Sequence, residues 1–224
     1  NFVIWLSPVG VFCLIYSTFS SLGISIIFTL INYFLIVVGV LIFHAVFTYS
    51  LLLTSLAKIN PFIFFTKMRE AIIFAFSTSS SSATMPITLK TVEEKLGIDK
   101  SVSSFCIPLG TTINMDGTAI MQGVATVFIA QVYQVDLSMM EYLMVIITAT
   151  LASIGTAGVP GVGLIMLAMV LQQVGLPVEG IALIIGVDRL LDMLRTAVNV
   201  SGDATISCIV ANSENQLSRK DFIS

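Results

Sequence analysis

The stretch Asp188–Asp203, DRLLDMLRTAVNVSGD, places charged and amide side chains inside an otherwise apolar segment. It lies between the apolar runs 181–187 and 204–210. Its main polar residues recur at steps of four, three, four and four. At about 100° per residue this spacing puts them on one face of a helix, which we call the polar stripe. The stripe comprises Asp188, Asp192, Arg195, Asn199 and Asp203.

Charges on such a stripe are expensive if the helix lies in a membrane, at roughly 2.5–3.5 kcal/mol each near the bilayer centre. One interpretation is an internal salt bridge between Asp192 and Arg195 that holds two helices together. That bridge uses only one of three aspartates. The surplus negative charge would attract a cation, and the arginine would attract an anion. The stripe therefore favours a site for ion-coupled uptake of an anionic solute.

The composition indicates an all-α membrane protein. The 224 residues are 56% hydrophobic and 10% charged, whereas a soluble domain is about 25% charged, and the mean hydropathy is +1.01. Two apolar segments, 2–25 and 27–57, predict two transmembrane helices over 1–57. The chain begins at Asn1 without a methionine, so we expect it to be a fragment of a longer protein. No basic patch is present, and no nucleic-acid partner is expected.

His44 is the only histidine in the sequence. It could serve a proton relay, or it could be a hydrogen-bonded packing residue. No second titrating group stands near it in the sequence. We therefore predict a packing role.

Residues 61–96 predict a first re-entrant helical hairpin. The charged residues within 58–70 indicate a water-exposed turn. The apolar run 71–76, too short to span, then leads into the hydroxyl-rich tip 77–86. The alternative is a serine-rich surface loop.

Residues 101–134 predict a broken transmembrane helix. Asn114, Asp116 and Gly117 are poor helix formers in the middle of an apolar segment. Carbonyls freed by the break, together with a carboxylate, are hard oxygen ligands suited to a small cation such as Na⁺. The alternative is a simple surface turn between two short apolar hairpins.

Residues 139–172 predict a second re-entrant hairpin, because the Gly-rich tip 155–163 separates two short apolar arms. Segments 61–134 and 139–214 thus repeat one plan, and such paired interruptions indicate a transport site at the midplane. Basic residues cluster around the first hairpin and the tail, while the turns around the second hairpin carry only acids. The positive-inside rule then predicts an inverted repeat and a cytoplasmic tail over 215–224.

Four motifs together resemble the glutamate/aspartate transporter family, the dicarboxylate/amino acid:cation symporters. They are SSSSATMP at 79–86, NMDGT at 114–118, GTAGVPGVG at 155–163, and 192–203 of the polar stripe. The resemblance implies that 1–57 are the fifth and sixth spans and that 58–224 form the transport core. It also implies a homotrimer, built through scaffold spans absent from this sequence, in the plasma (inner) membrane.

The resemblance also implies ligand contacts. Arg195 would pair with the side-chain carboxylate of a bound amino acid, and Asp192 with its ammonium group, which suits a guanidinium and a carboxylate. The remainder would be held by Asn199, Thr196, Thr118, Ser81 and the backbone at Val159 and Gly163. Relatives often have a further arginine where this chain has Ser79 or Met193.

The resemblance further implies sites for Na⁺ as the coupled ion, with no other cofactor. Asp203 with backbone oxygens of Gly110, Asn114 and Asn199 would form one site. Thr112, Ser153, Ile154 and Thr156 would form a second. Asp116 with Asn114 would belong to a third, whose other ligands fall on a missing span.

We therefore predict a secondary active transporter of aspartate or glutamate, coupled to Na⁺ with H⁺ coupling left open, working by alternating access with the second hairpin as outer gate. A C4-dicarboxylate:cation symporter is the alternative, although such a substrate has no ammonium group that Asp192 could bind. An ion channel is a rival of a different class. An intramembrane serine hydrolase is disfavoured, because His44 would be its only base and no Gly-x-Ser-x-Gly motif exists. We expect no enzyme.

Overall fold

The computed structural model describes residues 16, 26–219 and 222. These residues are helical apart from turns and one isolated antiparallel bridge between Ile98 and Leu217, which confirms the prediction of an all-α chain. The predicted span 2–25, apart from Tyr16, lies outside the described residues. The elements are α2 (Ile26–Phe43), η1 (His44–Thr48), α3 (Tyr49–Leu52), η2 (Leu53–Ala57), α4 (Pro61–Thr78), α5 (Ser81–Glu94), α6 (Lys100–Ile113), α7 (Asp116–Val132), α8 (Met139–Ile154), α9 (Val162–Gln173), η3 (Val178–Gly180) and α10 (Ile181–Ser213).

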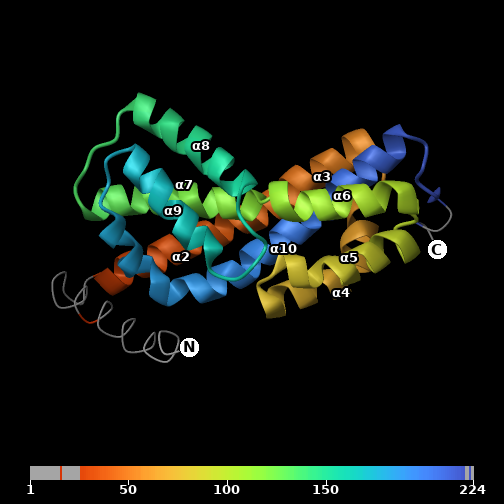
Figure 1. Cartoon of the computed structure of the whole chain (residues 1–224), viewed down its shortest axis with the longest axis horizontal. Helices are drawn as coiled ribbons and strands as arrows, with labels where there is room; N and C mark the ends of the chain where they lie inside the picture. Colours follow the sequence, from red (N-terminus) through yellow and green to blue (C-terminus); the bar gives the residue numbers. More distant parts are fainter. Residues whose placement is uncertain (1–15, 17–25, 220–221, 223–224) are drawn as a thin grey trace.

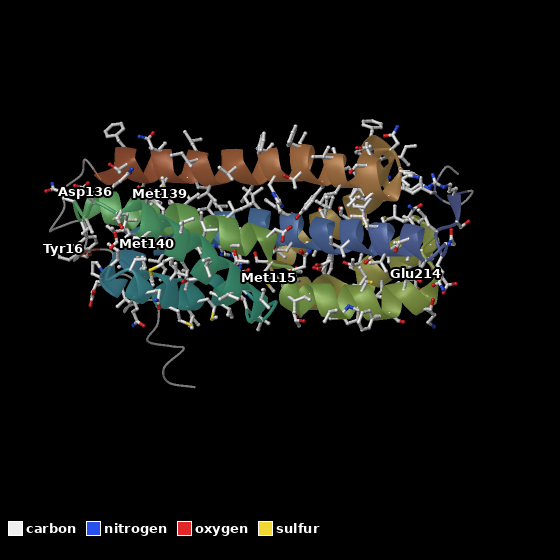
Figure 2. All side chains as sticks on the ribbon, turned by 90° about the horizontal axis from the view of Figure 1, so that it is seen from above. Tyr16, Met115, Asp136, Met139, Met140 and Glu214 are labelled. Carbon is white, nitrogen blue, oxygen red and sulfur yellow. The ribbon has the colours of Figure 1, made fainter. Side chains whose placement is uncertain are left out.

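One continuous helical path runs from α2 through η2, with π-helical turns at η1 and η2. Among the described residues, only its stretch Phe28–Ala57 is long and apolar enough to cross a membrane, judged by length and composition. Figure 2 shows this path along one side of the molecule, with side chains directed away from the other helices. Several of them are exposed and apolar, including Phe28, Leu35 and Phe47.

Helices α4 and α5 form the first hairpin. Asn60 caps α4 by accepting a hydrogen bond from the Phe62 N–H, and Pro61 occupies the first turn, where its missing N–H has no cost. The turn predicted over 58–70 is confined to residues 58–60, because α4 already begins at Pro61. Phe64 and Met68 are fully buried on one face of α4. The charges of this segment therefore belong to a helix with one buried face.

Helices α6 and α7 are separated at Asn114 and Met115, whose backbones leave the helical conformation. Figure 1 shows α6 and α7 lying end to end along the longest axis. The first hairpin packs beside α6, and the second hairpin, α8 and α9, packs beside α7. Met115 lies between the two ends of the molecule that carry Asp136 and Glu214 (Figure 2).

The second hairpin begins with a capping box, in which the Ser138 hydroxyl accepts from the Glu141 N–H and the Glu141 carboxylate accepts from the Ser138 N–H. The hydrogen bonds from the Ser138 N–H and hydroxyl lower the pKa of Glu141. Helix α8 ends before Gly155, and α9 starts after Gly161, which has a φ of 81°. A positive φ of this kind is accessible to glycine without strain.

The buried apolar side chains form two clusters, one toward each end of α10. The first includes Leu30, Met121 and Leu167, and the second includes Phe64, Ile107 and Cys208. Helix α10 contributes to both, with Leu191 in the first and Ala204 in the second. The polar stripe lies along α10 where the two clusters adjoin.

Candidate functional site

The polar stripe lies on α10 and is largely buried. Asp188, Arg195, Asn199 and Asp203 are each at most 4% exposed, and the Asp192 side chain is 13% exposed. Arg195 is the largest of the fully buried side chains. A guanidinium at such depth needs nearby negative charge or oxygen acceptors.

Arg195 pairs with two aspartates of its own helix. Its Nη1 donates to Asp188 Oδ1 at 2.8 Å, and its Nη2 donates to Asp192 Oδ1 at 2.8 Å. The salt bridge between Asp192 and Arg195 is thus present, but both residues lie on α10, so it does not hold two helices together as that interpretation assumed. Asp188 joins it from two turns earlier. Asp188 was predicted to lie on the stripe, but it had no predicted role. The spacing of seven residues, or two helical turns, between Asp188 and Arg195 was the sequence signal that could have identified Asp188 as a partner of Arg195.

The tips of the two hairpins meet at this site. The Gly158 carbonyl accepts hydrogen bonds from the Ser82 N–H at 3.1 Å and from the Ser80 hydroxyl at 2.7 Å. The Gly161 N–H donates to Asp192 Oδ2 at 3.0 Å. The tip of the second hairpin is therefore bound both to the first hairpin and to the polar stripe.

Several predicted ligand contacts come together beside Arg195. Asn199 Nδ2 donates to the Thr118 hydroxyl at 3.4 Å. A methyl group built on Gly163 would lie 3.4 Å from Thr118 Cγ2 and 3.5 Å from Arg195 Nη2. Ser81 is buried at the first turn of α5, and its Cβ would lie 3.2 Å from a methyl group on Gly158.

Two predicted contacts are less closely involved in this state. The Thr196 hydroxyl donates to the Asp192 carbonyl one turn earlier on the same helix. Val159 is 47% exposed, and its N–H donates to the carbonyl of Ala157 within the same tip.

Three residues of the first predicted sodium site are neighbours. Asn114 Nδ2 donates to Asp203 Oδ1 at 3.0 Å, and a methyl group on Gly110 would lie 2.6 Å from the same oxygen. Gly110 lies within α6 and Asn114 directly follows that helix, and both contact the Asp203 carboxylate of α10. Asn199 lies one turn before Asp203, and its Oδ1 accepts from the Gly117 N–H at 2.8 Å.

Two residues of the second predicted sodium site are joined directly, since the Thr156 N–H donates to the Ser153 carbonyl at 3.2 Å. The hydroxyls of Thr112, Ser153 and Thr156 each donate to a carbonyl three or four residues earlier at 2.8 Å. Ser153 and Thr156 are buried, whereas Thr112 and Ile154 are exposed.

Asp116 contacts two side chains that the sequence analysis did not connect with it. Its Oδ2 lies 2.9 Å from the Tyr49 hydroxyl and 3.1 Å from His44 Nε2. His44 has no titrating neighbour nearby in the sequence, but the fold supplies Asp116 from 72 residues away. No local sequence signal could have revealed this pair.

The described residues contain no group of three or more His, Cys, Asp and Glu side chains arranged to hold a metal ion. Oxygen ligands at this site would instead come from single carboxylates, amides and backbone carbonyls. Such a set suits a monovalent hard cation better than a transition metal.

Comparison of the sequence with known proteins identifies its family. The profile of the sodium:dicarboxylate symporter family matches residues 1–213. An excitatory amino acid transporter of Caenorhabditis elegans is 45% identical over 93% of this chain and 42% of its own length. The human excitatory amino acid transporter 1 is 44% identical over 98% of this chain and 41% of its own length. The human excitatory amino acid transporter 5 is 46% identical over 85% of this chain and 33% of its own length.

This chain thus spans less than half the length of these relatives. The match to the family profile nevertheless covers the first hairpin, the broken helix, the second hairpin and the whole polar stripe. The chain belongs to the sodium:dicarboxylate symporter family, whose members are membrane transporters and not enzymes.

Proposed function

We propose that this chain contains the transport core of a secondary active transporter that takes up acidic amino acids, aspartate or glutamate, together with Na⁺. The observation that carries the proposal is the buried Arg195, held between Asp188 and Asp192 where the two hairpin tips meet. The names of the relatives, which are excitatory amino acid transporters, support the same substrate class.

The pairing of Arg195 suggests how an acidic amino acid would bind. The side-chain carboxylate of the substrate replaces Asp192 at Nη2, and the freed Asp192 accepts the substrate ammonium group. Asp188 keeps its bond to Nη1 and so maintains the orientation of the guanidinium; it is a positioning residue. A two-pronged donor is suited to carboxylate in a way that a lysine is not.

Charge balance accounts for the need for a coupled cation. With all groups ionised, Asp188, Asp192 and Arg195 carry a net charge of −1, since two acids oppose one base. An acidic amino acid brings two carboxylates and one ammonium, and so adds a further negative charge. Uncompensated charge in a buried membrane site is strongly unfavourable. Sodium held by Asp203 with Gly110, Asn114 and Asn199 would balance the further negative charge of Asp203 itself. A second ion at Thr112, Ser153, Ile154 and Thr156, which carry no charge, would offset one of the negative charges at the polar stripe. Asp116 with Asn114 would contribute to a third.

The arrangement of the hairpins supports alternating access. The hairpins pack beside opposite halves of α6 and α7 (Figure 1), as expected for re-entrant hairpins in an inverted repeat. The tip of the second hairpin is bound to the stripe through Asp192, so a substrate that engages Asp192 would shift the closure of this hairpin. We infer that residues 58–224 move against a scaffold that makes a homotrimer in the plasma (inner) membrane, with residues 215–224 in the cytoplasm and residues 1–57 as two spans.

The test is accumulation of L-aspartate by proteoliposomes that contain the full-length protein. An inward Na⁺ gradient is expected to drive accumulation against the aspartate gradient, and replacing Na⁺ by choline should stop it. Equilibration without accumulation would indicate a channel. Transport of succinate but not of aspartate would indicate a C4-dicarboxylate carrier, and aspartate accumulation driven by a proton gradient alone would move the coupling to H⁺.

Gly158→Ala is expected to weaken aspartate binding by roughly tenfold. The added methyl group would lie 2.8 Å from Ser82 Oγ and 3.0 Å from Ser82 N, so the hairpin tips could not close as they do here. Overpacking of this kind costs about 1–3 kcal/mol, and a cost in the closed state lowers apparent affinity. Gly155→Ala in the same tip is the matched control, because a methyl group there meets nothing within 4 Å. Equal affinities in both variants, measured by titration calorimetry, would contradict tip closure as a condition for binding.

A further inference from the structure

Beyond α10, residues 215–219 fold back onto the end of the molecule that carries the first hairpin; we call them the C-terminal strap. The chain reverses at Asn215, which has a φ of 57°, and the Gln216 N–H returns to the Ala211 carbonyl at 2.7 Å. Figure 1 shows the strap, in dark blue, beside the ends of α5 and α6. The strap is therefore a packed element and not a free tail.

The strap pairs with the segment that follows the first hairpin, residues 97–101, which we call the exit foot. The Asp99 N–H donates to the Gln216 carbonyl at 3.0 Å, and the Ser218 N–H donates to the Gly97 carbonyl at 2.8 Å. These two bonds flank the antiparallel bridge between Ile98 and Leu217. Two backbone bonds in register define a short two-stranded ribbon across the exit foot.

The same strap reaches the segment that precedes the first hairpin, residues 56–60, which we call the entry foot. Arg219 Nη1 donates to the Lys58 carbonyl at 3.0 Å, and Nη2 donates to Asn212 Oδ1 at 2.9 Å. Asn212, in the last turn of α10, in turn donates to the Leu56 carbonyl at 3.0 Å. These donors satisfy carbonyls at the end of the helical path that finishes at Ala57.

The feet of the second hairpin are bound differently. The N–H groups of Val135 and Leu176 donate to the carbonyls of Ala130 and Leu171, five residues earlier in each case. The Gly180 N–H likewise bonds locally, to the Pro177 carbonyl. Within the described residues, long-range hydrogen bonds at a hairpin foot are thus concentrated at the first hairpin.

We propose that the C-terminal strap is an intramolecular clamp that holds both feet of the first hairpin to the end of α10. An arm of 18 residues, such as α4, is about 27 Å long, so a small rotation at its foot would produce a large displacement at its tip. Tying both feet to α10 suppresses that rotation. The first hairpin and the polar stripe then move as one body, and opening is left to the second hairpin. This last consequence rests on the proposed function, whereas the clamp itself does not.

Hydrogen exchange of the full-length protein tests the clamp without reference to transport. The double variant Ser218→Pro with Arg219→Ala removes the N–H that bonds Gly97 and the guanidinium that bonds Lys58. Amides at 56–62 and 97–101 should exchange about tenfold faster, because lost hydrogen bonds lower the local opening free energy. Amides at 174–180 should be unchanged. Arg189→Ala, an exposed arginine of α10, is the control. Unchanged exchange at both feet would overturn the clamp.

A disulfide across the bridge tests whether the strap stays docked while the protein works. Ile98→Cys and Leu217→Cys would stand opposite each other in a non-hydrogen-bonded antiparallel pair, with Cα atoms about 4.5 Å apart, within disulfide range. The background would lack Cys13, Cys106 and Cys208. Oxidation should leave the aspartate uptake rate within about twofold of the reduced protein, as expected if the clamp stays closed throughout a cycle. Loss of uptake with retained binding would overturn the proposal, whereas absent uptake in the parent protein would instead contradict the proposed function.

Discussion

Arg195→Ala is expected to abolish measurable binding of L-aspartate while leaving the binding of L-serine detectable. Arg195 is 1% exposed, and its two terminal nitrogens already hold two carboxylates. Removing one partner of a buried charge-assisted pair costs roughly 2–5 kcal/mol, or about 30- to several-thousand-fold in affinity. Serine lacks the side-chain carboxylate and so does not use this contact. Titration calorimetry of the full-length protein in Na⁺ measures both ligands.

The control for this variant must separate binding from folding. Arg195→Ala leaves Asp188 and Asp192 buried without their common partner, and breaking a buried pair destabilises by about 3–5 kcal/mol. Arg195→Lys retains the positive charge but loses the two-pronged donor, so it should fold and still bind aspartate poorly. Aspartate binding of normal strength in either variant would show that Arg195 does not recognise the substrate.

Asp203→Asn is expected to weaken the binding of the Na⁺ that supports aspartate binding. Asp203 is 2% exposed, and its Oδ1 accepts from Asn114 Nδ2. An amide has nearly the same size as the carboxylate but no charge, and the affinity of a hard-cation site depends on its ligand charge. The Na⁺ concentration that half-saturates aspartate binding should rise by roughly tenfold or more. Aspartate titrations at increasing Na⁺ concentrations measure this value.

Gly110→Ala provides a companion variant that changes no charge. Its methyl group would lie 2.6 Å from Asp203 Oδ1 and 3.0 Å from Asp203 Cγ, so the carboxylate would have to move. It should reproduce the higher half-saturating Na⁺ concentration of Asp203→Asn. Gly123→Ala is the matched control, since a methyl group there meets nothing within 4 Å. A normal Na⁺ response in both Asp203→Asn and Gly110→Ala would exclude Asp203 from the sodium site.

Some features could be predicted from the sequence because their causes are local. The polar stripe follows from helical periodicity, and the break between α6 and α7 follows from poor helix formers at 114–117. The two tips follow from hydroxyl-rich and glycine-rich runs between short apolar arms. The composition predicts an all-α membrane protein, and four motifs in order indicate the family. Each of these signals lies within a few residues of the structure it predicts.

Charged residues in the sequence did not distinguish a turn from a helix with an exposed charged face. The charged residues within 58–70 predicted a turn, whereas α4 begins at Pro61 and buries Phe64 and Met68. When the buried face of a helix is narrow, its sequence contains about as many charged residues as a turn does, so the two patterns look alike. Deciding between the two requires the neighbouring helices against which that face packs.

Other features depend on contacts between distant segments, which only the tertiary structure decides. Asp116 meets His44 across 72 residues, the Ser80 hydroxyl meets Gly158 across 78, and Arg219 meets Lys58 across 161. Even within α10, helical periodicity placed Asp188 and Asp192 on one face with Arg195. It did not show that both carboxylates bind the Arg195 guanidinium. The physical reason is that a helix fixes the direction of a side chain by local geometry, whereas its partner is selected by how separate helices pack.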